Sequence, residues 1–226
     1  MNLILPATDR LETIKRYSMR YKEFGYSPKS LGWDKGKQDV RFNVLTSHYD
    51  FTDKAVLDVG CGFGDLNKTL FNKYGNRYSY LGIDLVPDLI SEARERYTRN
   101  GIDFNACDFL AVELERDFDY VVASGIFNHR LSAANNYELI EATMAKAFSV
   151  ARDGLAFDFL SDKVDYQLEH TFHSSPEKIL AMAYKYSRNV VLRNDYMPFE
   201  FAVFIIKDDS FSSDDTLFNR YKAQLL

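Results

Sequence analysis

Residues 56–66 of the chain read Val56-Leu57-Asp58-Val59-Gly60-Cys61-Gly62-Phe63-Gly64-Asp65-Leu66. A short apolar strand is followed by a turn with three alternating glycines, and a helix pattern starts directly after it. Glycine allows the backbone to bend sharply and to approach a ligand closely. The dinucleotide fingerprint G-x-G-x-x-G would need glycine at position 65, where Asp65 stands. The stretch therefore predicts a site for a nucleoside that carries a small zwitterion, rather than for a pyrophosphate.

Strand and helix patterns alternate along the rest of the chain. The predicted strands are 55–59, 78–83, 102–107, 119–123, 155–160, 189–193 and 199–206, and the predicted helices are 6–20, 35–50, 65–74, 87–98, 133–149 and 176–186. This alternation is typical of a parallel sheet covered on both faces. The gap at 194–198 is too short for a helical crossover, so we expect the last strand to run antiparallel.

We expect three regions along the chain. Residues 1–50 form an N-terminal helical lid, residues 51–207 form the ligand-binding domain, and residues 208–226 form a C-terminal tail helix that packs on it. The tail helix is predicted because Leu217, Phe218, Tyr221 and Leu225 recur at helical spacing.

Composition limits the possible classes of protein. A net charge of −5 and a pI near 5.4 argue against a nucleic-acid binder. No apolar stretch approaches the roughly 20 residues that span a bilayer, and we expect no membrane partner. The two cysteines do not suggest a disulfide framework, and the first 20 residues lack a signal-peptide pattern. We therefore expect a cytoplasmic protein.

An aspartate ends each of the first three predicted strands: Asp58, Asp84 and Asp108. The carboxyl ends of parallel strands meet at one edge of the sheet, where ligands bind. Asp58 could hold the glycine turn by accepting backbone hydrogen bonds. Asp84 could accept from both hydroxyls of a ribose, and Asp108 from an adenine amino group.

The segment from Val56 to about Leu160 resembles the class I S-adenosylmethionine-dependent methyltransferases. The resemblance implies an α/β fold, a Rossmann-like three-layer sandwich with a seven-stranded, mostly parallel sheet and an antiparallel last strand. It also implies S-adenosylmethionine as the cofactor, with Asp84 on its ribose, Asp108 and Phe109 on its adenine and Leu85 against the adenine ring. The glycine turn would approach the methionine part. The expected cofactor-binding set from this segment is Asp58, Gly60, Cys61, Gly62, Gly64, Asp84, Leu85, Asp108, Phe109 and Ser124.

The N-terminal stretch 31–41 is similar to that of bacterial members that act on small molecules. Arg41 either pairs with the cofactor carboxylate or lies on a solvated helix face. Trp33 either closes the cleft over the cofactor or anchors the lid.

The loop after the fourth strand should bring the acceptor to the methyl group. His129 is the first candidate for a general base, because a neutral imidazole is available near pH 7; the alternative is a loop histidine without a catalytic part. Asn128 is expected to orient the acceptor. In the long connection after the fifth strand, Tyr166 and His170 are expected to contact the substrate, and Glu169, His170 and His173 lack the further ligands that a metal site needs. We predict no metal.

The acceptor is expected to be a small molecule methylated on oxygen or nitrogen. The chain lacks the Asn/Asp-Pro-Pro-aromatic motif of enzymes that methylate base amino groups. Two alternatives stay open: a cofactor-binding protein without turnover, and a nicotinamide-dependent oxidoreductase. The latter would need a third glycine in the other register and a catalytic Tyr/Lys pair, neither of which is found. The sequence does not assign an oligomeric state.

Overall fold

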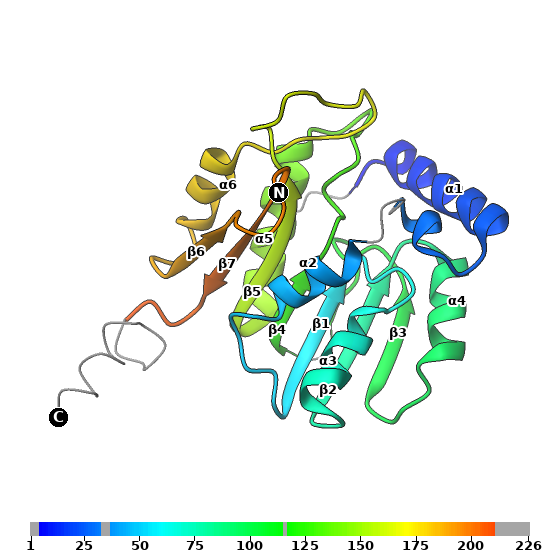
Figure 1. The fold of residues 1–226 in the computed structure, drawn as a ribbon, viewed down its shortest axis with the longest axis horizontal. Coiled ribbons are helices and arrows are strands. Elements are labelled where there is room, and N and C mark those ends of the chain that lie inside the picture. The colour runs from blue at the N-terminus through cyan, green and yellow to red at the C-terminus, as the bar shows by residue number, and fades with distance from the viewer. Residues whose placement is uncertain (1–4, 33–36, 115–116, 211–226) are drawn as a thin grey trace.

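The computed structural model describes residues 5–32, 37–114 and 117–210. These residues contain one seven-stranded sheet with the order β3-β2-β1-β4-β5-β7-β6 (Figure 1). Its strands are β1 (Lys54–Val59), β2 (Tyr78–Asp84), β3 (Ile102–Ala106), β4 (Phe118–Ala123), β5 (Ala151–Leu160), β6 (Val190–Arg193) and β7 (Glu200–Ile206). Strand β7 runs antiparallel to both β5 and β6, whereas β1 to β5 pair in parallel. The predicted α/β fold with an antiparallel last strand is confirmed.

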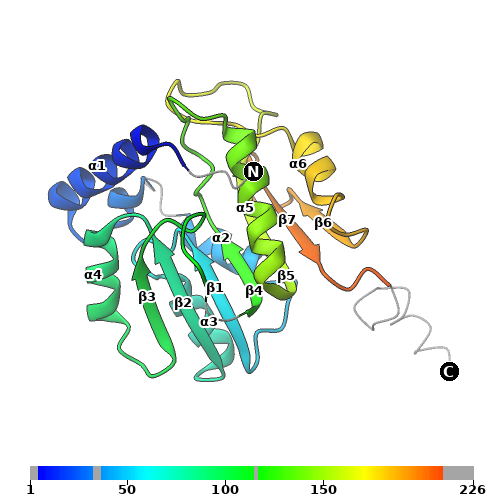
Figure 2. The same ribbon diagram turned by 180° about the vertical axis from the view of Figure 1, so that it is seen from behind.

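Helices cover both faces of this sheet. The described helices are α1 (Ala7–Phe24), the 3-10 helix η1 (Pro28–Leu31), α2 (Gln38–Leu45), α3 (Leu66–Tyr74), α4 (Pro87–Arg96), α5 (Asn136–Val150) and α6 (Pro176–Ala183). Helices α2 and α3 lie in front of the sheet in Figure 1, and α5 lies in front of it in Figure 2. Helix α1 lies above the carboxyl ends of the strands.

Side chains alternate in direction along each strand, and this explains why helices pack on both faces of the sheet to give three layers. In β1, Val56 packs with one face of the sheet, while Leu57 and Val59 pack with the other. The first face is buried with Phe42 of α2 and Leu70 of α3, and the second with residues of α5 and α6. Because successive side chains point to opposite faces, a strand that is covered on both sides is apolar at most of its positions.

Two predicted boundaries differ from the structure for identifiable reasons. Strand β5 begins at Ala151 rather than at 155, and Gly154 lies inside it. A Cβ at Gly154 would come within 2.7 Å of the Tyr49 hydroxyl, which donates to the Leu155 carbonyl; glycine thus lets a residue outside the sheet brace it. Helix α5 begins at Asn136 rather than at 133 because Asn135 is its N-cap, with a side chain that accepts from Tyr137 N–H. The N–H groups of 132–134 donate to Asp9 of α1.

One helix predicted near the N-terminus and one predicted at the C-terminus extend beyond the described residues. The predicted helix 35–50 is the shorter α2, and positions 35 and 36 are outside the described ranges, as is Trp33. The predicted tail helix lies almost wholly in 211–226, which is also outside them.

A buried ion pair ties α2 to the last strand. The guanidinium of Arg41 donates through Nε and Nη2 to both carboxylate oxygens of Glu200, and the two side chains are 4% and 1% exposed. Arg41 is therefore not on a solvated helix face, and its predicted partner, a cofactor carboxylate, is replaced by Glu200. Burial lowers the pKa of Arg41 to about 10.

Removing one partner of this pair should destabilise the fold. Arg41→Met leaves the Glu200 carboxylate buried without its cation, so we expect a loss of about 3–5 kcal/mol in the free energy of unfolding, measured by urea denaturation. The double variant Arg41→Met/Glu200→Leu should recover most of that loss, because no buried charge remains.

The exposed pair Arg77–Asp53, with both side chains 64% exposed, provides the control. Arg77→Met should cost less than about 1 kcal/mol. If Arg41→Met and Arg77→Met lowered the free energy of unfolding by the same amount, burial of the Arg41 pair would have no effect on the cost of breaking it.

Candidate functional site

The glycine turn after β1 is held by the neighbouring strand β2. The N–H groups of Gly60 and Cys61 donate to the Ile83 carbonyl at 2.7 and 3.0 Å, and Gly62 N–H donates to Asp84 Oδ2 at 2.9 Å. Gly60 has φ +71°, and a Cβ there would lie 2.1 Å from the Ile126 side chain. The turn therefore needs glycine both for its backbone angle and for the close approach of the loop after β4.

Asp58 does not hold this turn, contrary to the prediction. Its carboxylate accepts a 2.6 Å hydrogen bond from the Tyr80 hydroxyl, and the turn's N–H groups find their acceptors on β2. Asp58 is 4% exposed, and burial raises the pKa of its carboxyl to about 7. The acid at the end of β1 is a buried group under the turn.

The other two aspartates lie where each strand ends. Asp84 Oδ1 accepts from Val86 N–H, in addition to its contact with Gly62, and burial raises the pKa of Asp84. Asp108 Oδ1 accepts from Leu110 N–H at 2.9 Å. Among the described residues Asp108 Oδ2 is buried without a hydrogen-bond partner. A buried carboxylate oxygen without a donor is costly, and this one is available to a ligand donor.

A cavity of about 180 Å³, called here the first cavity, lies between this edge of the sheet and the N-terminal helices. Nine of the ten predicted cofactor-binding residues of the core segment line it: Asp58, Gly60, Cys61, Gly62, Asp84, Leu85, Asp108, Phe109 and Ser124. Gly64 does not; a Cβ there would lie 2.5 Å from the Phe104 ring, so Gly64 serves packing. Arg41 does not line it either.

The N-terminal region adds lining residues that the sequence reading missed. Thr13 and Tyr17 of α1, Leu31 of η1 and Phe42 of α2 face the first cavity. Burial raises the pKa of the Tyr17 hydroxyl. The sequence indicates only that the N-terminal region is helical, and this pattern does not predict which of its residues face the edge of the sheet.

A second cavity, of about 590 Å³, adjoins the first. The two share Tyr17, Leu31, Gly125 and His129 in their linings. All four predicted catalytic residues, Asn128, His129, Tyr166 and His170, line the second cavity. Tyr166 is 74% exposed, so it lies at the open side.

The loop after β4 is braced from several sides. Asp158, 1% exposed, accepts from the Ser124 hydroxyl at 2.6 Å and from Gly125 N–H at 2.7 Å. Asn128 Oδ1 accepts from Leu160 N–H at 3.2 Å, and His129 forms a β-bridge with Thr171. The side-chain oxygen of Asn128 is thus engaged by the backbone, and its Nδ2–H groups are the donors with which it would orient an acceptor. The sequence does not predict this role of Asp158, because no local pattern shows that its side chain contacts Ser124 and Gly125.

His129 contacts Arg16 of α1. Arg16 Nη1 lies 3.0 Å from His129 Nδ1. A guanidinium has only donors, so Nδ1 must accept and a neutral ring carries its proton on Nε2. Burial and the neighbouring Arg16 charge lower the pKa of His129. In this arrangement the ring presents a donor to its surroundings, and the nitrogen that a base would use is occupied by Arg16.

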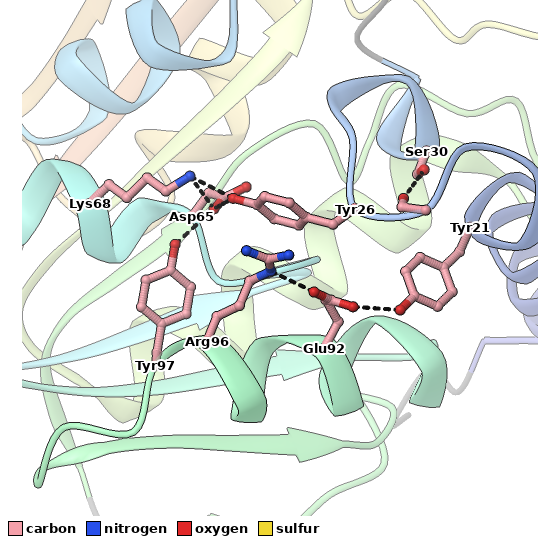
Figure 3. A network of polar contacts seen from close by, with 9 residues as sticks. Tyr21, Tyr26, Ser30, Asp65, Lys68, Glu92, Arg96 and Tyr97 are labelled. Carbon is pink, nitrogen blue, oxygen red and sulfur yellow. Dashed lines mark hydrogen bonds and ion pairs between the residues drawn. The ribbon is translucent and has the colours of Figure 1, made fainter.

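Polar contacts fasten the N-terminal helices over the first cavity (Figure 3). The Tyr26 hydroxyl donates to Asp65 at 2.6 Å and accepts from Lys68 at 2.5 Å, and the Tyr21 hydroxyl donates to Glu92 of α4 at 2.5 Å. The Arg96 guanidinium stacks 3.3 Å from the centre of the Tyr26 ring. This group of residues, called here the latch, joins the segment between α1 and η1 to α3 and α4.

Two absences hold for the part of the chain that the structure describes. No group of three or more His, Cys, Asp or Glu side chains there is arranged to hold a metal ion. No helix there is long and apolar enough to cross a membrane.

The His129 ring should show the Nε2–H tautomer in solution. Long-range ¹H–¹⁵N NMR should give a pKa below the ordinary value of 6.5, and Arg16→Gln should raise it, because a positive charge beside the ring is removed. The signals of His48, which packs on Tyr49 and Phe204, serve as the control and should not move. An unchanged His129 pKa in the variant would show that Arg16 does not contact the ring.

Weakening the latch should loosen the N-terminal helices. Tyr26→Phe removes a hydroxyl that makes two hydrogen bonds, so amide hydrogen exchange in residues 7–31 should become about two- to tenfold faster. Tyr184→Phe, at a side chain that is 54% exposed, should leave exchange unchanged. Identical exchange in both variants would contradict a role of the latch in holding this segment.

Comparison with known proteins gives a family for this site. A family model described as a methyltransferase domain matches residues 50–201. "Putative methyltransferase Rv1506c" of Mycobacterium tuberculosis is 31% identical over 158 residues, which are 68% of this chain and 93% of that protein. The malonyl-[acyl-carrier protein] O-methyltransferase of Acetivibrio thermocellus is 32% identical over 88 residues, which are 38% of this chain and 31% of that protein.

Solved structures share the fold at low sequence identity. The magnesium protoporphyrin IX methyltransferase of Synechocystis PCC 6803, solved with S-adenosylmethionine bound, has a TM-score of 0.64 and 14% identity, over 91% of this chain and 100% of that chain. The N-methyltransferase NodS of Bradyrhizobium japonicum WM9, solved with S-adenosylhomocysteine, has a TM-score of 0.62 and 14% identity, over 84% of this chain and 97% of that chain. The matched family model and the relative aligned over most of its length show that this chain belongs to the class I S-adenosylmethionine-dependent methyltransferases.

Proposed function

We propose that the protein transfers the methyl group of S-adenosylmethionine to a small-molecule acceptor, with the cofactor in the first cavity and the acceptor in the second. The observation that carries this proposal is the junction of the two cavities, where Gly125 and His129 belong to both linings. Transfer needs the sulfonium methyl and the acceptor atom in line and close together, and two adjoining cavities provide that alignment.

The lining of the first cavity fits the parts of the cofactor. Asp84 accepts from the ribose hydroxyls, and the free Oδ2 of Asp108 accepts from the adenine amino group. Leu85 and Phe109 pack against the adenine ring. The methionine part lies along the turn formed by Gly60, Cys61 and Gly62, with Ser124 on the side of the loop after β4.

The N-terminal region acts as the lid of this site. Residues 1–50 bring Tyr17 and Leu31 over both cavities, and the core domain 51–207 provides the edge of the sheet. Closure of the lid removes water from the reacting atoms, which strengthens the electrostatic interactions there. The latch keeps the lid in this position.

His129 takes part by placing the acceptor. In the tautomer that the Arg16 contact requires, the Nε2–H donates a hydrogen bond to the acceptor molecule while Arg16 holds Nδ1. Tyr166 and His170 contact the acceptor from the segment after β5.

Similar proteins support a small acceptor. Two of them are a magnesium protoporphyrin IX methyltransferase and a malonyl-[acyl-carrier protein] O-methyltransferase. The sequence contains no motif for methylating base amino groups. Neither observation chooses between oxygen and nitrogen as the methylated atom.

Removing the Asp84 carboxylate should weaken cofactor binding. Asp84→Ala loses the acceptor for the ribose and for Gly62 N–H, so calorimetry should show affinity for S-adenosylhomocysteine reduced at least about tenfold. Asp103→Ala, which removes an exposed carboxylate from β3, should bind with unchanged affinity. Equal affinity of the two variants would overturn the ribose assignment.

Turnover separates an enzyme from a binding protein on the same scaffold. Formation of S-adenosylhomocysteine from S-adenosylmethionine in the presence of an acceptor supports the proposal. Tight cofactor binding without turnover across a broad acceptor panel would favour a protein that binds the cofactor without transferring its methyl group.

A further inference from the structure

The second cavity has a charge opposite to that of the whole protein. The chain carries a net charge of −5. The second cavity is nevertheless lined by five cationic side chains, those of Arg16, Arg20, Lys37, Arg41 and Lys163. Its acidic lining residues are Asp165 and Glu200. A concentration of positive charge in a cleft of an acidic protein indicates an anionic ligand.

Three of these cations already have defined partners. Arg41 forms the buried pair with Glu200, so the charges of these two residues cancel. Lys163 Nζ lies 2.9 Å from Glu177 and 3.5 Å from Asp162. Arg20 donates to the Lys29 carbonyl. These residues shape the wall of the second cavity.

Arg16 and Lys37 differ from them. Among the described residues, the hydrogen-bond contact of Arg16 is to His129, a neutral acceptor, and no carboxylate lies within ion-pair distance of it. Lys37 Nζ lies 5.5 Å from the centre of the Phe199 ring, and no described carboxylate pairs with it. Both lining side chains therefore keep a charge that these contacts do not neutralise.

The second cavity also has apolar lining residues. The segment after β5 contributes Val164, Tyr166 and Leu168 to the lining, beside polar residues such as Asp165 and His170. Tyr166 is 74% and Leu168 is 52% exposed, which leaves apolar surface open to a ligand. Exposed apolar side chains gathered in a cavity mark a binding surface.

We propose that the methyl acceptor is an amphiphilic small-molecule anion. Its carboxylate or phosphate binds to Arg16 and Lys37, and its apolar part packs on Val164, Tyr166 and Leu168. This inference rests on the proposed function, since it assigns the substrate class of the same second cavity.

The contact with His129 also fixes where Arg16 can hold the anion. A guanidinium has five N–H donors in a planar fork, and the histidine uses a donor on Nη1 alone. The remaining donors can hold an anion beside the His129 ring at the junction of the two cavities. Arg16 thus acts as a specificity-determining residue.

Small probes of matched shape test the charge requirement. Ligand-observed NMR titrations use the full-length protein saturated with S-adenosylhomocysteine and the probes 4-phenylbutyrate, phenyl phosphate and neutral 4-phenylbutyramide. We expect 4-phenylbutyrate or phenyl phosphate to bind at least about tenfold more tightly than the amide, because a charge-assisted hydrogen bond replaces a neutral one. The tighter of the two acids identifies the anionic group as carboxylate or phosphate.

Variants locate the anion. Arg16→Gln and Lys37→Gln should each reduce the preference for the acid over the amide several-fold, while binding of the amide stays the same. Lys15→Gln is the matched control, since Lys15 precedes Arg16 on α1, is exposed and does not line the second cavity; it should keep the full preference. The preference should also shrink at high salt.

Equal binding of acids and amide, or no measurable binding of either acid, overturns the inference. A preference that survives both Arg16→Gln and Lys37→Gln overturns it as well. Calorimetry of S-adenosylhomocysteine on the same samples separates the two proposals. A protein that fails to bind this molecule contradicts the proposed function, whereas one that binds it without preferring the acids contradicts the substrate class alone.

Discussion

The hydrogen bonds between the glycine turn and β2 are the constraint on which the site depends. Because Gly60 and Cys61 donate to Ile83 and Gly62 donates to Asp84, the turn after β1 and the acid after β2 are fixed as one unit. The tight approach of Ile126 to Gly60 then fixes the loop after β4 against the same unit. The first cavity and the loop after β4 are therefore placed by one short stretch of backbone.

Other interactions position parts of the chain that are distant in sequence around this unit. Asp9 of α1 accepts from the N–H groups of 132–134, and the latch joins the N-terminal helices to α3 and α4. Asp158 fixes Gly125 from β5. The N-terminal helices, the loop after β4 and the core are connected by buried or half-buried carboxylates, each of which accepts several hydrogen bonds and so restricts the geometry more than an apolar contact would.

Much of the fold and of the first cavity could be predicted from sequence. The parallel sheet follows from the alternation of strands and helices, and its antiparallel last strand from the short gap before β7. The common edge that the strand-end acids share follows from the geometry of a parallel sheet. Two boundaries were wrong. Helix α5 starts at Asn136, after three residues whose N–H groups donate to Asp9, and β5 starts at Ala151, so that Gly154, over which Tyr49 passes, lies inside the strand.

The sequence by itself determined the class of fold, the glycine turn and those residues of the sheet edge that line the first cavity, because these depend on local patterns and on the common edge of parallel strands. Only the tertiary structure decided the partners of individual side chains. Arg41 pairs with Glu200, 159 positions away, and Asn128 and His129 are engaged by Leu160 and Arg16. Such contacts join residues far apart in the chain, and the periodicity of the sequence does not predict which of these residues come into contact.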